Sequence, residues 1–296
     1  MPPPISGMVF LPMNSDSSQP AAGGQLFIVA TPIGNLADIT FRAIETLKRV
    51  HLIAAEDTRT TGKLLQHYGI KTPMIALHEH NEASMAGRIL SILQDGEDVA
   101  LVSDAGTPLM SDPGYHLVAA ARRNGLRIVP VPGPSSITAA LCASALPPQP
   151  FRFHGFLPRS GRSRWLTLQK LTEDTATQIF FESPHRLLNT LHDLAKICGQ
   201  ERLACVAREL TKLHEEIITL PIGRLIQHFE NQPIRGECVV LLAPASETVE
   251  VDDETIMAHL NDASLRQLPA SAKAREVAAR LGISKRRVYA LMHRRE

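Results

Sequence analysis

Side chains that could bind a ligand follow the apolar run at residues 99–102, which predicts a buried strand. Asp104 could accept hydrogen bonds from a ribose or an ammonium group, and Thr107 adds a small hydroxyl. Gly106 has no Cβ, so the backbone there can approach a ligand closely. Loops that leave the carboxyl ends of strands bind ligands in alternating α/β sheets. We therefore expect a ligand site in this loop.

The end of the same loop has a structural interpretation. Asp112 is a preferred helix N-cap residue, and Pro113 suits the first position of a helix. An amphipathic stretch follows at residues 116–122. The pattern predicts that Asp112 caps this helix.

Five more loops carry a high density of polar side chains directly after a predicted strand. Because the carboxyl ends of parallel strands meet at one edge of a sheet, we expect a large shared cleft there. These loops span residues 31–35, 56–60, 78–82, 182–186 and 208–209.

Several common catalytic motifs are missing from the sequence. It contains no G-x-x-x-x-G-K-[ST] phosphate loop, no G-x-G-x-x-G after the first strand and no G-x-S-x-G nucleophile motif. His78 and His80 are two residues apart with no evident third ligand, so we expect a polar loop or a substrate contact and no metal site. The four cysteines have no C-x-x-C or His-paired spacing, which indicates core residues in a reducing cytoplasm.

The length of 296 residues suggests two domains, and 44% hydrophobic with 21% charged residues is typical of a globular protein. We find no run of 18 apolar residues and no basic region ahead of an apolar core near the N-terminus. These observations predict neither a transmembrane helix nor a secretory signal. Residues 1–24 are rich in Pro, Ser, Gly and Ala, which predicts a disordered tail or a start-site extension.

Strands and helices alternate over residues 25–147, which predicts an α/β domain with a largely parallel sheet covered on both faces. The expected strands are 25–30, 51–55, 74–77, 99–102 and 127–131. The expected helices are 38–49, capped by Asp38 or Thr40, and 60–68, 82–94, 116–122 and 135–145.

The prolines at 147, 148 and 150 break this alternation and predict a domain boundary. A second, shorter α/β domain over residues 151–245 is expected to have antiparallel edges. Its expected strands are 151–156, 178–182, 203–208, 216–220 and 238–243, and its expected helices are 162–171, 185–198 and 222–229.

An acidic linker leads to a purely helical tail at residues 252–296. Residues 272–292 have helix-turn-helix form, with Gly282 at the turn and Ser284 as the cap of the second helix. Lysines and arginines gather in this tail and again from residue 159 to 170. Such clusters on a nearly neutral chain (formal net charge +1) favour a polyphosphate partner. The predicted nucleic-acid contacts in them are Arg159, Arg162, Arg164, Lys285, Arg286 and Arg287.

Long ordered motifs show that the chain resembles the ribosomal RNA methyltransferases of the tetrapyrrole methylase fold. The similarity runs from about residue 26 to 244. It implies two α/β domains with the active site in the cleft between them, S-adenosylmethionine as the methyl donor, and a homodimer. It also implies methyl transfer to the ribose 2′-oxygen of a cytidine in 16S rRNA of the small (30S) subunit. The motifs lie at residues 27–40, 55–59, 102–114, 131–136 and 180–186.

The resemblance also implies which positions hold the cofactor. The first loop should border it, the loop after residue 102 should hold its methionine or ribose part, and the second domain should close over the adenosine. Porphyrin-type relatives have a glycine-richer first loop, whereas Pro32 stands at one of those positions here. The expected cofactor-binding residues are Pro32, Gly34, Asp104, Gly106, Thr107, Ser136, Ile137, Phe181, Gly236 and Glu237.

A general base could remove the proton of the accepting 2′-hydroxyl. Glu182 is the first candidate because it ends a strand that faces the expected cleft, and Asp57 and Glu56 are the others. The alternative is that Glu182 only holds Arg186 or caps the next helix. Arg59 and Arg186 are expected to contact the RNA.

Two other functions remain open from the sequence. One is a small-molecule methyltransferase of the same fold, acting on a tetrapyrrole or a diphthine-type substrate, against which the basic clusters count. The other is a non-enzymatic helix-turn-helix regulator that binds nucleic acid, against which the polar loops count.

Overall fold

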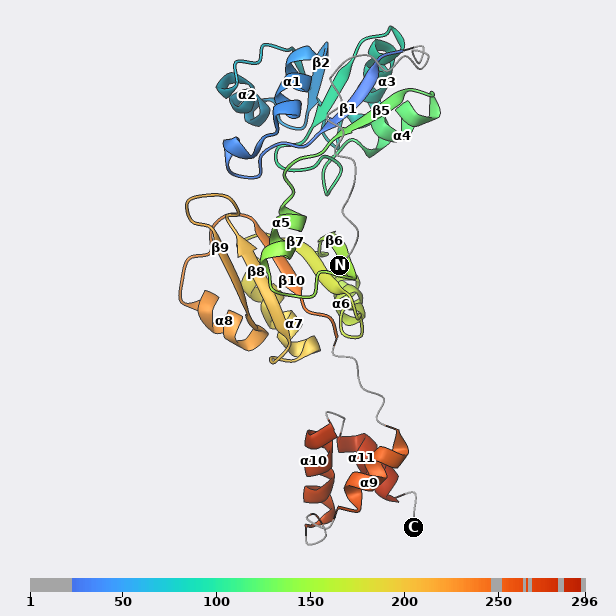
Figure 1. The fold of residues 1–296 in the computed structure, drawn as a ribbon, viewed down its shortest axis with the longest axis vertical. Helices are drawn as coiled ribbons and strands as arrows, with labels where there is room; N and C mark the ends of the chain where they lie inside the picture. Colours follow the sequence, from blue (N-terminus) through green and yellow to red (C-terminus); the bar gives the residue numbers. More distant parts are fainter. Residues whose placement is uncertain (1–22, 246–251, 263–264, 266–267, 282–284, 294–296) are drawn as a thin grey trace, which may run out of the picture.

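The computed structural model describes residues 23–245, 252–262, 265, 268–281 and 285–293. It contains two α/β units followed by a small helical unit (Figure 1). Nearly all of the predicted disordered tail, and most of the predicted acidic linker, lie outside these residues.

The first unit is built on a five-stranded parallel sheet in the order β3-β2-β4-β1-β5, as the alternation predicted. The residues of β2 and β4 are all buried, because helices cover both faces of the sheet. The strands are β1 (Gln25–Val29), β2 (Leu52–Ala55), β3 (Met74–Ala76), β4 (Val99–Val102) and β5 (Arg127–Val131).

Two helices pack on each face of this sheet. One face carries α1 (Phe41–Arg49) and α2 (Thr58–His67), and the other carries α3 (Glu82–Gln94) and α4 (Tyr115–Arg123). A short 3₁₀ turn, η1 (Leu36–Asp38), precedes α1, which the hydroxyl of Thr40 caps by accepting from the Ala43 amide. The neighbouring strands β1 and β4 are followed by helices on opposite faces of the sheet. Where two adjacent strands diverge in this way, a crevice forms at their carboxyl ends.

The prediction that Asp112 caps α4 is wrong. The residue at the N-cap is Gly114, with φ of 121°, and it has no side chain to offer. The Glu82 carboxylate on α3 accepts from the amides of His116 (2.7 Å) and Leu117 (3.4 Å) instead. A cap supplied by another helix frees the Asp112 side chain for a different role.

The second unit has a mixed sheet in the order β6-β7-β10-β8-β9. The antiparallel edge predicted from the sequence is present at β9, whereas the other edge strand, β6, is parallel to β7. In the centre, β10 is antiparallel to both of its neighbours. The strands are β6 (Phe151–Phe156), β7 (Thr177–Glu182), β8 (Leu203–Arg208), β9 (Glu216–Pro221) and β10 (Cys238–Leu242).

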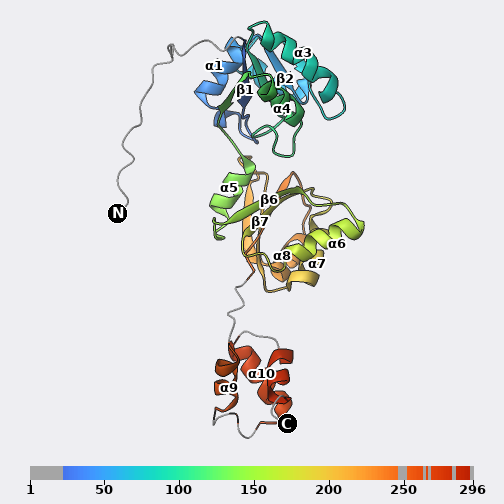
Figure 2. The same ribbon diagram turned by 90° about the vertical axis from the view of Figure 1, so that its right-hand side faces the viewer.

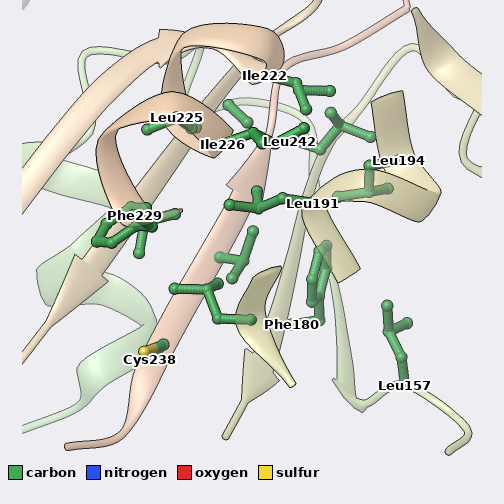
Figure 3. Packing of buried hydrophobic residues seen from close by; sticks show 14 of the residues in the cluster. Leu157, Phe180, Leu191, Leu194, Ile222, Leu225, Ile226, Phe229, Cys238 and Leu242 are labelled. Atoms are coloured by element: carbon green, nitrogen blue, oxygen red, sulfur yellow. The ribbon is translucent and has the colours of Figure 1, made fainter. Parts of the chain in front are cut away.

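One face of this sheet packs against α6 (Gly161–Lys170), α7 (Leu187–Cys198) and α8 (Ile222–Glu230). Phe180 and Phe229 are fully buried in this core, as Figure 3 shows. The other face packs against α5 (Ser136–Ala143) through Ile137 and Ala140. The sequence assigned this helix to the first domain, but its packing places the physical boundary between β5 and α5, earlier than the proline break.

The helical unit contains α9 (Asp253–Leu260), α10 (Ala270–Leu281) and α11 (Lys285–His293). The predicted helix pair is present as α10 and α11, and it packs on α9 around Ile256, Val277 and Val288. The predicted turn and cap residues, Gly282 and Ser284, lie outside the described residues. In the part of the chain that the structure covers, we find no helix with the length and apolarity needed to cross a membrane.

Candidate active site

A cavity of about 310 Å³ lies between the carboxyl ends of the first sheet and the second unit, where α5 begins. This position agrees with the cleft predicted from the sequence. The volume is at the lower end of the range for small-molecule sites. The lining includes Ile33, Glu56, Asp104, Gly106, Thr107, Met110, Ser111, Asp112, Ser135, Ser136, Ile137, Phe156, Phe181, Glu182, Glu209, Leu210, Lys212, Glu237, Cys238 and Val239.

Backbone hydrogen bonds hold the floor of this cavity in place. Thr31 and Gly106 exchange two of them, at 2.9 and 3.0 Å, and Gly106 has φ of 82°. The hydroxyl of Thr107 donates to the carbonyl of Pro134 at 3.3 Å, just before α5. Because these groups are already engaged, Gly106 and Thr107 shape the cavity through their backbone path.

The second unit supplies an apolar wall. Phe181 on β7 makes edge-on contacts with Phe153 and Phe156 on β6, with ring centroids 4.9 and 5.5 Å apart. Ile137 at the start of α5 and Val239 on β10 are buried next to it. This wall suits the face of a flat aromatic ligand group.

The cavity is also acidic. Glu56, Asp104, Asp112 and Glu237 line it, and its one lining cation among the described residues, Lys212, is paired with Glu209 at 2.8 Å. Burial raises the pKa of Glu56 and of Asp104. Burial also raises the pKa of Asp112 to about 6, assisted by the negative charge of Glu56. The cavity therefore favours a cationic ligand.

Seven of the ten residues predicted to bind a cofactor line the cavity: Asp104, Gly106, Thr107, Ser136, Ile137, Phe181 and Glu237. Pro32, Gly34 and Gly236 do not. A Cβ on Gly34 would come within 2.7 Å of the Leu210 carbonyl, so this glycine permits close contact between the two units. Gly236 has φ of 74° and packs against the Glu209 side chain.

In two of the three candidate bases, Glu182 and Asp57, the carboxylate is held in hydrogen bonds with neighbouring groups. Glu182 is buried and accepts from the Ser183 amide (2.8 Å) and the Thr190 hydroxyl (2.7 Å), and Arg186 lies 3.4 Å away. This is the alternative in which Glu182 holds Arg186. Glu182 also lines the cavity, as the sequence predicted, but the sequence did not show that Ser183 and Thr190 hold its carboxylate.

Asp57 is the N-cap of α2, accepting from the Arg59 amide at 2.8 Å. Its hydrogen bonds with the Arg59 side chain and amide lower its pKa to about 2, which makes it a weak base. Glu56 remains in the cavity, and Asp112, which the sequence had assigned to a cap, joins it. The signal that could have identified Asp112 is its position in the same loop as Asp104.

The arginines predicted to bind RNA fall into two groups. Arg164 is buried and bonded to Asp193, Thr190 and the Pro158 carbonyl, so the expectation that it contacts RNA is wrong. Arg186 donates to the Leu157 and Pro158 carbonyls and so also holds the fold.

Arg59, Arg159 and Arg162 are exposed, although Arg59 is paired with Asp57. In the tail Lys285 and Arg287 are exposed, with Arg287 3.4 Å from Asp253; the side chain of Arg286 lies outside the described part. Among the residues that the structure describes, no group of His, Cys, Asp and Glu is arranged to hold a metal ion.

Comparison with known proteins places this fold and its cavity among methyltransferases. Residues 25–226 match the family model of the Tetrapyrrole (Corrin/Porphyrin) Methylases. Solved structures of the same fold include a cobalt precorrin-4 methyltransferase (TM-score 0.58, 19% identity, covering 74% of this chain and 94% of that one). A diphthine synthase is similar (TM-score 0.58, 14% identity, 74% and 90% covered).

Relatives with higher sequence identity indicate a particular family within this class. A protein of Pseudomonas aeruginosa named Ribosomal RNA small subunit methyltransferase I is 48% identical over 90% of this chain and 96% of its own length. Proteins of the same name from Escherichia coli O157:H7 (50% identical, 77% and 79% covered) and Synechocystis (44% identical, 90% and 97% covered) are also similar. The chain belongs to this family of tetrapyrrole-methylase-fold methyltransferases.

Proposed function

We propose that this enzyme transfers a methyl group from S-adenosylmethionine to the ribose 2′-oxygen of a cytidine in 16S rRNA of the small ribosomal subunit. The observation that carries the proposal is the acidic and aromatic cavity between the two units, in a chain 48% identical to a small-subunit rRNA methyltransferase. The enzyme is proposed to act in the cytoplasm as a homodimer.

The residues of the cavity fit this cofactor. S-adenosylmethionine supplies a methyl group on a sulfonium and also carries an ammonium, and Asp104, Glu56 and Glu237 provide complementary negative charge. Asp104 uses one carboxylate oxygen to accept from the Asp57 amide at 3.0 Å, so its position is fixed in advance. Phe181 and Ile137 offer an apolar surface for an adenine ring.

The amino end of α5 adds a second element of recognition. Ser135 and Ser136 lie there at the cavity, and the N-cap Ser135 makes no side-chain cap bond. Free amides at a helix start attract a carboxylate, such as that of the methionine part of the donor.

Asp112 and Glu56 are the proposed acceptors of the 2′-hydroxyl proton. Raised pKa values make both groups stronger bases than an ordinary carboxylate, and Asp112, with a pKa of about 6, is still ionised at neutral pH. Orientation of the hydroxyl by the cavity supplies the other part of the acceleration. Asp112 replaces Glu182 as the first candidate because both carboxylate oxygens of Glu182 already accept hydrogen bonds, from the Ser183 amide and the Thr190 hydroxyl.

The basic residues outside the cavity would bind the RNA. Arg159 and Arg162 are exposed on the second unit, and Lys285 and Arg287 on the helical unit. Phosphate contacts of this kind supply affinity that weakens with salt.

The test compares methyl acceptors. Purified enzyme and S-adenosylmethionine with a labelled methyl group are incubated with small subunits from a strain lacking the gene, with protein-free 16S rRNA, with duplex DNA and with a tetrapyrrole. The proposal predicts label in the rRNA of one or both ribosomal substrates. Label in the tetrapyrrole alone, or in no acceptor, would contradict it.

A further inference from the structure

The only tryptophan of the chain, Trp165, lies on the outer side of α6 with 53% of its surface exposed. Its neighbour Leu166 is 43% exposed. Figure 2 shows α6 at the outside of the second unit. A tryptophan side chain with so large an exposed fraction is common on binding surfaces, because the indole offers a large apolar area with few rotatable bonds.

Contacts on the inner side of α6 fix the rotation of this helix about its axis. The Arg164 guanidinium donates to Asp193 (2.9 Å), to the Thr190 hydroxyl (3.0 Å) and to the Pro158 carbonyl (3.1 Å). One turn later Leu168 is buried in the core of the second unit. Since these two residues fix the buried side of the helix, Trp165 is held on its outer side.

The surface around Trp165 is positively charged. Arg159, Arg162 and Lys170 are exposed, and within the described part of the chain none of them takes part in an ion pair. No acidic residue occurs from Phe156 to Leu171. This charge is complementary to a phosphate backbone, whereas the exposed Phe41 at the start of α1 lies beside both an arginine and Glu45.

The same segment leads away from the cavity. β6 ends at Phe156, which is 54% exposed and also lines the cavity. Arg159 follows three residues later, and α6 begins at Gly161. An RNA strand that places one nucleotide in the cavity would therefore continue over this segment.

We propose that Trp165 stacks on an unpaired base of the rRNA strand close to the target nucleotide, while Arg159 and Arg162 bind the adjoining phosphates. The inference rests on the proposed function and adds the residue that positions the strand. Aromatic side chains recognise unpaired RNA bases by stacking, and the loss of one stacking partner weakens binding by roughly 5- to 150-fold. Trp165 does not line the cavity, so its part is to position the RNA and not to act on the methyl group.

The first experiment compares W165A and W165F with F41A, which removes another exposed aromatic side chain from the first unit. W165A should raise KM for undermethylated small subunits roughly 5- to 150-fold and leave kcat and the affinity for S-adenosylmethionine unchanged. W165F should recover most of the affinity, and F41A should resemble the wild type. An unchanged KM in W165A would overturn the inference while leaving the proposed function intact, provided the wild-type enzyme methylates the subunits.

The second experiment uses the fluorescence of Trp165, which is the chain's only indole. Protein-free 16S rRNA has no tryptophan, so titrating it into the enzyme reports on this side chain alone. We expect quenching at constant protein concentration and protection from acrylamide. Fluorescence that changes with protein concentration and not with RNA, together with an altered oligomeric state of W165A in light scattering, would assign Trp165 to an interface between two copies and overturn the inference.

Discussion

Replacing Asp112 with asparagine should stabilise the folded protein and impair methyl transfer. Asparagine keeps the size of the protonated carboxyl group and can still accept the hydrogen bond from Ser103. What it removes is a negative charge that burial and the neighbouring Glu56 disfavour. A gain in stability with a loss of activity is typical of a residue retained for function.

The size of the stability gain follows from the pKa of Asp112, about 6 when folded against the ordinary 3.8. That difference corresponds to about 3 kcal/mol. Solvent reaches this half-buried carboxylate and screens it, which reduces the effect to about 1 to 2 kcal/mol. Because the folded pKa is raised, the folded state holds the proton more tightly, and wild-type stability falls as pH rises from 3.8 to about 6.

Urea unfolding of wild type and D112N from pH 4 to pH 8, without cofactor, measures this effect. The advantage of D112N should grow through that window and be constant above pH 6.5. In parallel, wild-type kcat should rise with pH through about 6 to a plateau, and D112N should be roughly 100-fold slower or more.

D57N is the control, because this substitution should change the free energy of unfolding in the opposite direction. The pKa of Asp57 is lowered to about 2, so its charge stabilises the fold above pH 4 and D57N should be less stable there. Equal stability of D112N and wild type at every pH, or full activity of D112N, would refute the assignment of Asp112.

Three further predictions concern the cavity and the tail. G34A should weaken binding of S-adenosylmethionine about 10-fold in calorimetry, because the new Cβ would press on the Leu210 carbonyl. The control G87A should bind normally, because no atom lies within 4 Å of the Cβ it adds. E237Q should reduce affinity for S-adenosylmethionine more than for the product S-adenosylhomocysteine, which lacks the sulfonium charge, and an equal reduction for both ligands would argue against recognition of that charge. Removing residues 250–296 should weaken RNA binding and flatten its salt dependence while cofactor affinity persists; undiminished RNA affinity would exclude the tail.

The sequence predicted the strands of both sheets well because each is a short apolar run between turn residues. It also predicted the cleft, since polar loops follow β1, β2, β4 and β7. Of the two predicted caps of α1, Asp38 and Thr40, the structure shows Thr40, whose hydroxyl accepts from the Ala43 amide.

The errors arise from contacts between distant residues. Asp112 looks like a cap in sequence, but Glu82, thirty residues earlier, fills that place. Arg164 belongs to a basic run, yet its contacts with Asp193 and Thr190 on another helix bury it. No local pattern contains such a partner, so burial of a polar side chain could not be predicted there.

The assignment of α5 failed for a related reason. Its apolar residues suit either sheet, and only the tertiary packing of Ile137 on Ile179 and Val239 shows which one it covers.

The position of the transferred methyl group tests directly whether the enzyme is a ribose 2′-O-methyltransferase. Small subunits from a strain lacking the gene are methylated with the purified enzyme, and the 16S rRNA is digested and analysed by mass spectrometry. We expect one new methyl group on the ribose 2′-oxygen of a cytidine, formed roughly 100-fold more slowly, or more slowly still, when D112N replaces the wild-type enzyme under the same conditions. A methyl group on a base, or unmodified rRNA with the wild-type enzyme, would contradict it.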